Sequence, residues 1–580
     1  MKLTYTLEYC LLPLINEKRP NPTSGGTSKL LFISIVVLLI EQTRFLFVYP
    51  IPDTAMWFGD ESWMMLLGRG LIKTGSARFP EALGSTLFHS TGLIVGSLWG
   101  YALLYGAPGY WWGHSVMFGH AFTLVEIGRI VTLLVSLVTL YYTYHIARQL
   151  DIAKTYAIAC VLLITTCDAF LFSTHSARSD GLTGLGVLVL LSMCLRAIEH
   201  QVRNKVLRPG WWFSFGLIAT GLLSFSQHHM TTAALFCVYA AWKLGALKHW
   251  RQFAAMIAGA TVIVGALLAI YFSSMGDISM YGSHRSLQYQ NIVGSLPVFH
   301  PFSVAVQWIN TYLRIRQFMM EAWPVGLLLA VGVLYWMLIA RPRPRIRIAQ
   351  PKVAFFLVAT FWLVMSCMLF EGPAVFYLIH LLPWLAIAAV LLAERAVRRF
   401  INGKARRVVI IVASLFVVCA ITNAFYHAEM FGNVGATLTQ AHSAAVSELL
   451  AKTYTLGKKP LIATAQQGVN YVDRDTNVRL MTYHFLLFGL ENVSPIEVID
   501  SEHVDYLLTY TGRPDDAMQS AADSYGTLVA TSIGHYTDLY RDYFAPNWTH
   551  LDTLRLYRWQ RSSRVAIPIE RNAFRFQRLP

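Results

Sequence analysis

The chain has 580 residues, of which 55% are hydrophobic and 14% are charged. Soluble globular proteins carry about 25% charged residues, so this composition excludes an ordinary soluble protein. The net charge of +15 would suit a nucleic-acid partner, but the basic residues alternate between loops, which favours an orientation signal in a membrane instead.

Apolar stretches of roughly 17–23 residues recur along the chain, and this is the length that spans a bilayer as a helix. The first begins after residues 1–28, a cytoplasmic head with proline and basic residues, and it has no small-residue cleavage site, so we interpret it as a retained span. The predicted spans, eleven in number, are residues 29–49, 125–147, 154–175, 180–198, 211–227, 229–245, 252–273, 322–340, 352–370, 373–393 and 407–426.

Basic residues concentrate in every second connection between these spans, which predicts that those connections are cytoplasmic. Examples are the clusters within residues 196–208, 243–251, 341–352 and 395–407. The alternation holds only if the apolar stretch Leu87–Tyr105 does not cross the membrane. Because that stretch is rich in glycine and serine, we place it as a re-entrant or interfacial helix within one long outer loop, residues 50–124.

Residues 427–580 are more polar and are predicted to form an extracytoplasmic α/β domain, because an odd number of spans precedes them. A helix-like stretch over Thr437–Thr453 is followed by short runs typical of strands: Pro460–Ala465, Val504–Tyr510, Thr527–Ile533 and Leu554–Trp559. None of the seven cysteines lies in this part, so its stability is expected to come from its core and not from disulfides.

The adjacent acids Asp60 and Glu61 follow the first span, in a loop rich in aromatic residues. Carboxylates beside lipid are costly and usually functional, and paired acids serve in proton transfer. The alternative is a solvated loop in which Glu61 pairs with Arg69 or Arg78.

Further polar residues occur at the outer ends of later spans. Arg178 and Asp180 lie between two spans, where Asp180 is also placed to act as a helix N-cap. His228 and His229 lie at a tight outer turn. They are candidates for contact with a substrate, and the alternative is that they are ordinary surface histidines. The outer loop 274–321 is long enough to act as a lid, and it contains His284 and Arg285.

In order and spacing, these residues resemble the GT-C glycosyltransferase superfamily, in particular the branch of protein O-mannosyltransferases and the lipid A aminoarabinose transferase. The matching elements run over residues 30–393: Asp60–Glu61, His89–Leu93, Arg129, Ala147–Leu150, Ala177–Asp180 and Tyr377–Pro383. Three basic residues frequent in that family are replaced here, by Ser62–Trp63, His89–Ser90 and Phe376.

The resemblance implies a polytopic α-helical membrane protein of the GT-C fold, with about eleven transmembrane helices (29–426) and a C-terminal extracytoplasmic α/β domain (427–580). It also implies an inverting transfer of a sugar from a polyprenyl-phosphate donor to an acceptor hydroxyl of a lipid, glycan or protein. Asp60 would be the catalytic base and Glu61 would support it. The residues expected to bind donor or acceptor are Arg178, Asp180, His89, His228, His229, His284, Arg285 and Tyr377.

No cofactor is required by this chemistry. The alternative is that the two acids bind a divalent metal ion. A bacterial inner membrane is the expected location, with membrane lipids and no nucleic acid as partners. Two other classes stay open: a transporter or lipid flippase, and a non-catalytic protein of the same fold that binds sugar-lipids. The polar residues gather at one face and no repeated halves occur, which speaks against a transporter.

Overall fold

The chain is seen here as a computed structural model, which is described where placement is well defined. The described residues are 24–44, 108, 111–112, 116–117, 120–121, 124–175, 179–203, 205–225, 227–243, 249–275, 312, 315–316, 318–339, 351–370, 378–400, 411–429, 460–464, 479–482, 499, 503–510, 522–535 and 551–560.

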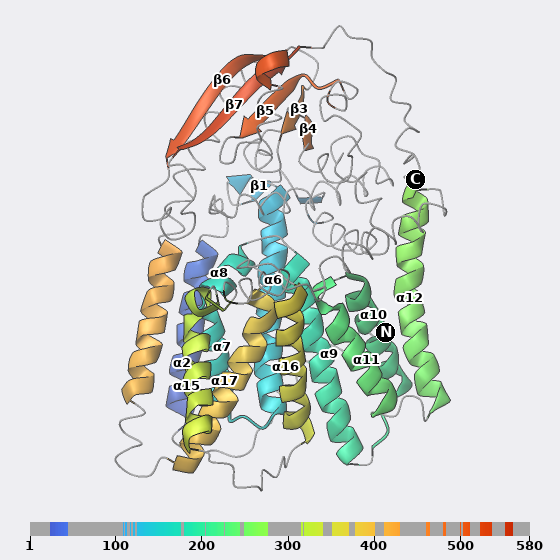
Figure 1. The fold of residues 1–580 in the computed structure, drawn as a ribbon, viewed down its shortest axis with the longest axis vertical. Helices are drawn as coiled ribbons and strands as arrows, with labels where there is room; N and C mark the ends of the chain where they lie inside the picture. Colours follow the sequence, from blue (N-terminus) through green and yellow to red (C-terminus); the bar gives the residue numbers. More distant parts are fainter. Residues whose placement is uncertain are drawn as a thin grey trace, which may run out of the picture.

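A bundle of helices carries a β-sheet above one of its ends (Figure 1). We call this end of the bundle the sheet end and the opposite end the far end. The helices are α2 (Ser24–Arg44), α6 (Leu124–Gln149), α7 (Lys154–Thr165), α8 (Asp168–Thr174), α9 (Ser179–Val202), α10 (Pro209–Phe225), α11 (Gln227–Trp242), α12 (Trp250–Met275), α15 (Trp323–Ile339), α16 (Pro351–Phe370), α17 (Leu378–Phe400) and the helix Ile411–Glu429. Every stretch predicted as a span therefore overlaps at least one described helix.

Among the described residues, five helices are long and apolar enough to cross a membrane, and the pair α7–α8 makes six if it is counted as one span. They are Gly26–Thr43, Glu126–Gln149, Gly181–Val202, Leu378–Val397 and Ile411–Glu429. Other apolar helices are shorter, at 10–17 residues. The chain is thus a polytopic helical membrane protein, and the count of eleven spans stays a prediction.

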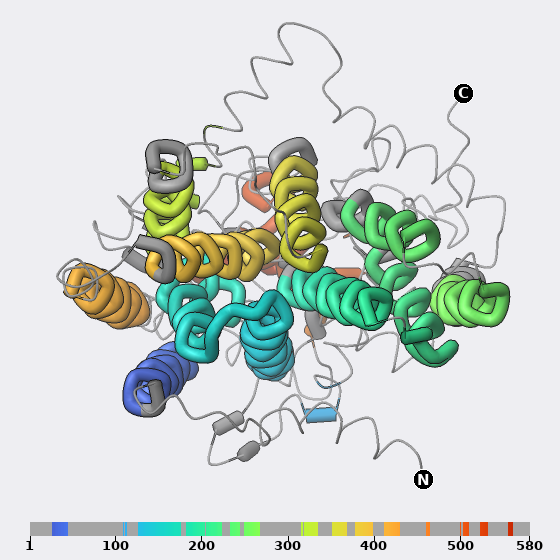
Figure 2. The backbone as a smooth tube through the Cα atoms, turned by 90° about the horizontal axis from the view of Figure 1, so that it is seen from below, coloured from blue at the N-terminus to red at the C-terminus, as the bar shows by residue number. Residues whose placement is uncertain are grey.

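The core of the bundle surrounds α17, which packs against α7, α9, α15 and α16. Trp384 of α17 is fully buried, and its ring stacks on Phe356 of α16 at 5.9 Å and on Phe236 of α11 at 6.4 Å. Seen from below, α2 and the helix Ile411–Glu429 lie at one side of the bundle and α12 lies at the opposite side (Figure 2).

The predicted span over 154–175 is broken into two helices. The chain ends α7 at Thr165 and begins α8 at Asp168, and the axes of the two helices differ by 72°. Hydroxyl groups help to end α7: Thr165 and Thr166 donate to the carbonyls of Leu162 and Leu163, both at 2.9 Å. Such side chains compete with regular helix propagation and accompany bends.

The strands of the C-terminal part form a five-stranded mixed sheet in the order β4-β3-β5-β7-β6. The strands are β3 (Leu461–Thr464), β4 (Arg479–Thr482), β5 (Tyr506–Tyr510), β6 (Gly526–His535) and β7 (Leu551–Trp559). The strand β3 runs parallel to β4 and β5, whereas β7 runs antiparallel to β5 and β6. A two-stranded pair, β1 (Val116–Met117) and β2 (His120–Ala121), lies in the predicted first outer loop.

Four of these five strands coincide with predicted runs, and β4 was not predicted. The four residues of β4 have no alternation of their own, so their pairing with β3 determines their structure. Leu461, Ile462 and Ala463 of β3 are buried, and Asp505 accepts a hydrogen bond at 2.8 Å from the backbone N–H of Leu461. The predicted helix at 437–453 and the re-entrant stretch Leu87–Tyr105 lie outside the described residues.

The helices α10 and α12 approach each other closely at two glycines. A Cβ atom added to Gly216 would lie 2.0 Å from the carbonyl oxygen of Met256, and one added to Gly259 would lie 2.1 Å from that of Phe213. Small residues at helix crossings are how membrane helices maximise contact, since lipid leaves no hydrophobic driving force between them.

We expect Gly259→Ala to separate α10 from α12 and to lower the free energy of unfolding by about 1–3 kcal/mol, the usual cost of overpacking. Gly265 of the same helix is the matched control, because a Cβ atom there meets nothing within 4 Å. Gly265→Ala should be neutral or slightly stabilising, since alanine favours helix. Thermal unfolding of the purified variants in detergent measures both, and equal stability of the two would show that the close approach is absent.

The predicted orientation, with the sheet outside the cytoplasm, is testable with single cysteines in a chain whose native cysteines are replaced. Val529 of β6 is 41% exposed, and Val206, between α9 and α10, is 70% exposed. In intact cells, a membrane-impermeant maleimide should label Val529→Cys and spare Val206→Cys, and lysis should make both reactive. The reverse labelling pattern would show that the orientation is opposite to the predicted one.

Candidate functional site at the sheet end

Most of the residues predicted for the site lie outside the described part of the chain, namely Asp60, Glu61, His89, Arg178, His284, Arg285 and Tyr377. Three others have a described backbone. Asp180 is the second residue of α9, so it lies inside the helix and not at the N-cap position before it. His228 and His229 lie in the first turn of α11 and not in the preceding turn. The site is therefore built from the helices that lead into these segments.

The short helix α8 is the polar centre of the sheet end. All seven of its residues are buried. At its first residue, Asp168 accepts a hydrogen bond at 2.6 Å from Nδ1 of His427, and the two side chains are only 2% and 10% exposed. His427 lies near the end of the helix Ile411–Glu429, so this pair joins α8 to a helix 259 residues away in the sequence.

The other end of α8 is held by α2. The ring of His175, the residue after α8, contacts the carbonyl oxygen of Gln42 through Nε2 at 2.8 Å. The side chain of Gln42 donates in turn to the carbonyl of Thr165 at 2.9 Å, on the other side of the break. A single residue of α2 therefore binds both α7 and α8, and it supplies a donor to a carbonyl next to the break in the helix.

Two charged residues of α6, Glu126 and Arg129, are buried at the same end of the bundle, each with 1% of its surface exposed. Arg129 lies within electrostatic range of His175. Charged side chains at this depth in a membrane bundle normally mark a functional region, because desolvating them is costly. Arg129 is one of the residues on which the resemblance in the sequence was based, but Glu126 and Asp168 were not predicted as site residues. Each of these two acids lies within or beside an apolar stretch, and this position is the feature of the sequence that marks them as candidates.

The second turn of α9 also meets the first turn of α17 at this end. Gly184 of α9 faces the backbone of Ile379 and His380, and a Cβ atom on Gly184 would lie 3.8 Å from the carbonyl oxygen of Ile379. Asp180 precedes Gly184 by one turn, and Tyr377 is attached directly to the start of α17. The fold thus places the attachment points of these two predicted site residues next to each other.

Three segments of the chain leave the bundle around α8, and two of them lead to predicted site residues. The chain leaves α2 toward Asp60 and Glu61, it leaves α8 toward Arg178, and it leaves Ile411–Glu429 toward the sheet. Within the described ranges, no group of three or more His, Cys, Asp or Glu side chains is placed to hold a metal ion. Because Asp60 and Glu61 are not among them, the alternative of a divalent metal stays a prediction.

Known structures share this arrangement of helices and sheet. The crystal structure of ArnT from Cupriavidus metallidurans in the apo state has a TM-score of 0.53 and 13% sequence identity, covering 92% of this chain and 98% of that one. The structure of the same protein bound to undecaprenyl phosphate has a TM-score of 0.56 and 11% identity, covering 91% and 98%. The chain has the fold of ArnT.

This likeness confirms the fold that the resemblance in the sequence implied, a helical bundle with a C-terminal sheet. No family model and no curated protein matches the chain by sequence. The ArnT fold covers both the helical bundle and the C-terminal sheet, since the match extends over nearly the full length of both chains.

We expect the Asp168–His427 pair to be energetically coupled, because removing one partner leaves the other buried without its hydrogen bond. Asp168→Ala or His427→Ala should each lower the free energy of unfolding by about 3–5 kcal/mol. The double variant should lose about 0.5–3 kcal/mol less than the sum of the two single losses. Unfolding in mixed detergent and SDS micelles measures all three.

Ser173→Ala is the control for this double-mutant cycle. Its hydroxyl donates only within α8, to Ala169 at 2.7 Å, so the loss should stay below about 1 kcal/mol. Additive losses for Asp168 and His427 would contradict the coupling, whatever their individual size.

Proposed function

We propose that the chain is an inverting glycosyltransferase that moves a sugar from a polyprenyl-phosphate carrier to an acceptor hydroxyl at the outer face of a bacterial inner membrane. The observation that carries this proposal is the ArnT fold over more than nine-tenths of the chain, including its match to a structure that contains undecaprenyl phosphate. Fold alone does not determine chemistry, so the residues of the site must support the same reaction.

The polar residues of the sheet end are consistent with such a reaction. Acids, cations and histidines of the described part gather there: Glu126, Arg129, Asp168, His175 and His427. Asp60 and Glu61 follow α2 in the sequence, and Arg178 follows α8. A lipid-linked donor needs its polar head at one membrane face and its chain among apolar helices. A one-sided polar centre above an apolar bundle meets that need.

In the proposed mechanism Asp60 removes the proton of the acceptor hydroxyl while the oxygen attacks the anomeric carbon of the donor. The bond from that carbon to the phosphate oxygen breaks, and the phosphate leaves with the negative charge. Cationic side chains stabilise the developing charge, and Arg178 and Arg285 are the proposed ones, with His284 and His89 beside them. Asp180, His228, His229 and Tyr377 are proposed to orient donor and acceptor, and Glu61 to orient Asp60.

The test is turnover by the purified full chain in nanodiscs, given a labelled polyprenyl-phosphate sugar and membrane lipids as acceptors. Asp60→Asn removes the proton acceptor but keeps the size of the side chain, so turnover should fall about 10²–10⁴-fold while the donor still binds. Glu61→Gln, which keeps size in the same way, should cost less because its role is orientation.

Other outcomes separate the alternatives. Full turnover by Asp60→Asn with an inactive Glu61→Gln would assign the base to Glu61. Donor binding with no turnover by the unmodified chain, across lipid, glycan and protein acceptors, would favour a non-catalytic sugar-lipid-binding protein. Movement of the intact labelled lipid between leaflets, without cleavage, would favour a flippase.

A further inference from the structure

At the far end of the bundle, hydrogen bonds join the ends of four helices in pairs. The side chain of Gln201, on α9, donates to the carbonyl of Lys243, after α11, at 2.9 Å. Gln252 of α12 donates to the carbonyl of Leu207, before α10, at 3.2 Å. We call residues 201–211 and 242–252, where described, the far-end platform. The close approach of α10 and α12 at their glycines holds its two halves together.

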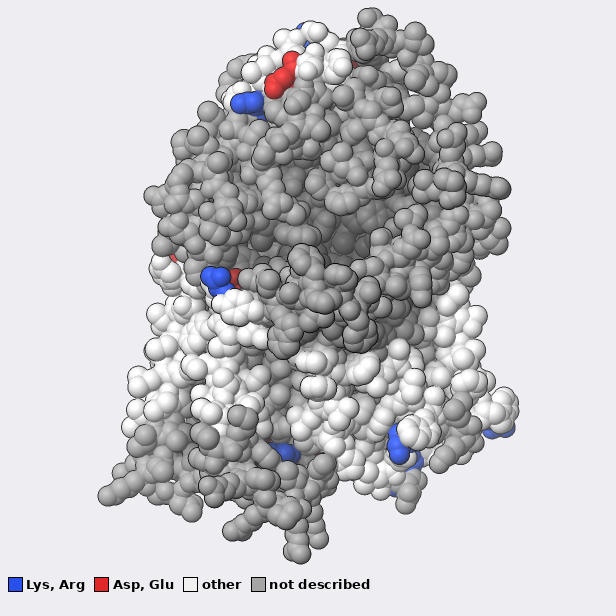
Figure 3. Space-filling view, viewed as in Figure 1, with Lys and Arg blue, Asp and Glu red and all other residues white. Residues whose placement is uncertain are grey.

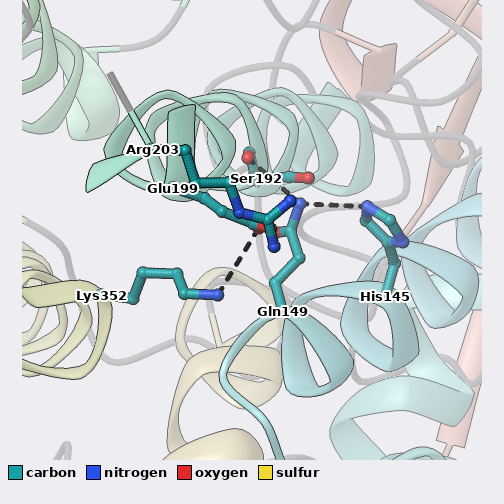
Figure 4. Close-up of polar contacts among 6 residues, drawn as sticks. All are labelled: His145, Gln149, Ser192, Glu199, Arg203 and Lys352. Carbon is teal, nitrogen blue, oxygen red and sulfur yellow. Dashed lines mark hydrogen bonds and ion pairs between the residues drawn. The ribbon is translucent and has the colours of Figure 1, made fainter. Parts of the chain in front are cut away.

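The platform carries exposed cations that its neighbouring acid does not neutralise. Glu199, just before the platform, is occupied by Arg203 at 2.6 Å and by Lys352 of α16 at 3.6 Å (Figure 4). In the same view Gln149 of α6 contacts His145 and the carbonyl of Ser192, so this cluster joins α6, α9 and α16. The cations that follow along the platform are exposed: Lys205, Arg208, Lys243 and Arg251.

Large apolar side chains stand exposed beside these cations. Trp242 is 69% exposed and Trp250 is 74% exposed. The Lys243 ammonium lies 4.8 Å from the Trp242 ring centroid, and the Arg251 guanidinium lies 5.7 Å from that of Trp250. Tryptophan paired with a cation is typical of the level where a membrane protein meets lipid headgroups.

An apolar surface continues from the platform along α12. Phe253, Ile257 and Val262 of this helix are exposed by 38%, 47% and 52%. Figure 3 shows the same order on one face of the molecule: basic side chains gather at the far end near α10–α12, and an uncharged surface lies above them. Exposed cations at the end of an apolar helix match an amphiphile with an anionic head.

We propose that the far-end platform binds an anionic phospholipid, with its phosphate at Lys205, Arg208 and Lys243 and its acyl chains along α12. Each Lys or Arg near an anionic lipid surface contributes about a fivefold gain in binding. A nucleic acid would also satisfy the charges, but it would leave the tryptophans and the apolar face of α12 in contact with a polyanion. The site lies at the opposite end of the bundle from α8, so it does not depend on the proposed transferase reaction.

The experiment is native mass spectrometry of the purified full chain released from nanodiscs of equimolar phosphatidylcholine and phosphatidylglycerol. The unmodified chain should retain phosphatidylglycerol in preference to phosphatidylcholine. Arg208→Gln with Lys243→Gln should weaken this preference about 10- to 30-fold, since two phosphate-binding cations are lost. Trp242→Ala with Trp250→Ala should also reduce retention while leaving the charge unchanged.

Lys154→Gln with Arg395→Gln is the matched control. These residues are exposed at the same end of the bundle, at the starts and ends of other helices, and the control removes the same charge. It should keep the preference for phosphatidylglycerol. Equal retention of the two lipids by the unmodified chain would overturn the proposal, as would an equal loss in the control, which would reduce the platform to an orientation signal. Displacement of phosphatidylglycerol by a short RNA would assign the surface to nucleic acid instead.

Discussion

In an apolar medium every backbone amide and carbonyl needs a partner within the protein, and this constraint shapes the whole sheet end. A continuous helix meets it automatically, but the break between α7 and α8 does not. Gln42 supplies a donor to the Thr165 carbonyl, and threonine hydroxyls serve the carbonyls one turn earlier. The helix can therefore bend by 72° inside the bundle, which lays α8 across the top of α7.

The bend matters because it places α8 where three segments of the chain leave the bundle. His427 contacts Asp168 at the start of α8, and Gln42 contacts His175 just after its end. Among the described residues, the first and the last of the long apolar helices are therefore joined to the same short segment, Asp168–His175. The segments that carry Asp60–Glu61, Arg178 and the sheet start beside it. A transferase needs its proton acceptor and its phosphate-binding cations in one place. The chain segments proposed to carry them leave the bundle close to α8.

The two ends of the bundle differ in the way they handle charge. At the sheet end, Glu126, Arg129 and Asp168 are buried at a cost that a purely structural bundle would avoid. At the far end the cations are exposed and accompanied by tryptophan, an arrangement suited to headgroups. The ArnT structures share the bundle and the sheet at 11–13% identity, so a similar backbone path is formed here by largely different side chains.

The positions of the helices and of four C-terminal strands followed from the sequence, because the length of an apolar stretch and the alternation of a strand are local properties. The fold shared with the ArnT structures also followed from the sequence, because the ordered set of motifs predicted it. The break at Thr166 was not predictable from the sequence, because α7 and α8 together have the length and composition of one span. The strand β4 was not predictable either, because its pairing with β3 defines it.

The pair Asp168–His427 shows the same limit for the candidate site. Each residue on its own is one polar group near the end of an apolar stretch, and nothing local relates two positions 259 residues apart. Their contact arises only when the last long helix packs beside the bend in α7–α8. The sequence by itself therefore determined which segments enter the membrane and which motifs the chain carries, whereas the tertiary structure decided which buried charges meet, because burial and pairing depend on packing between distant helices.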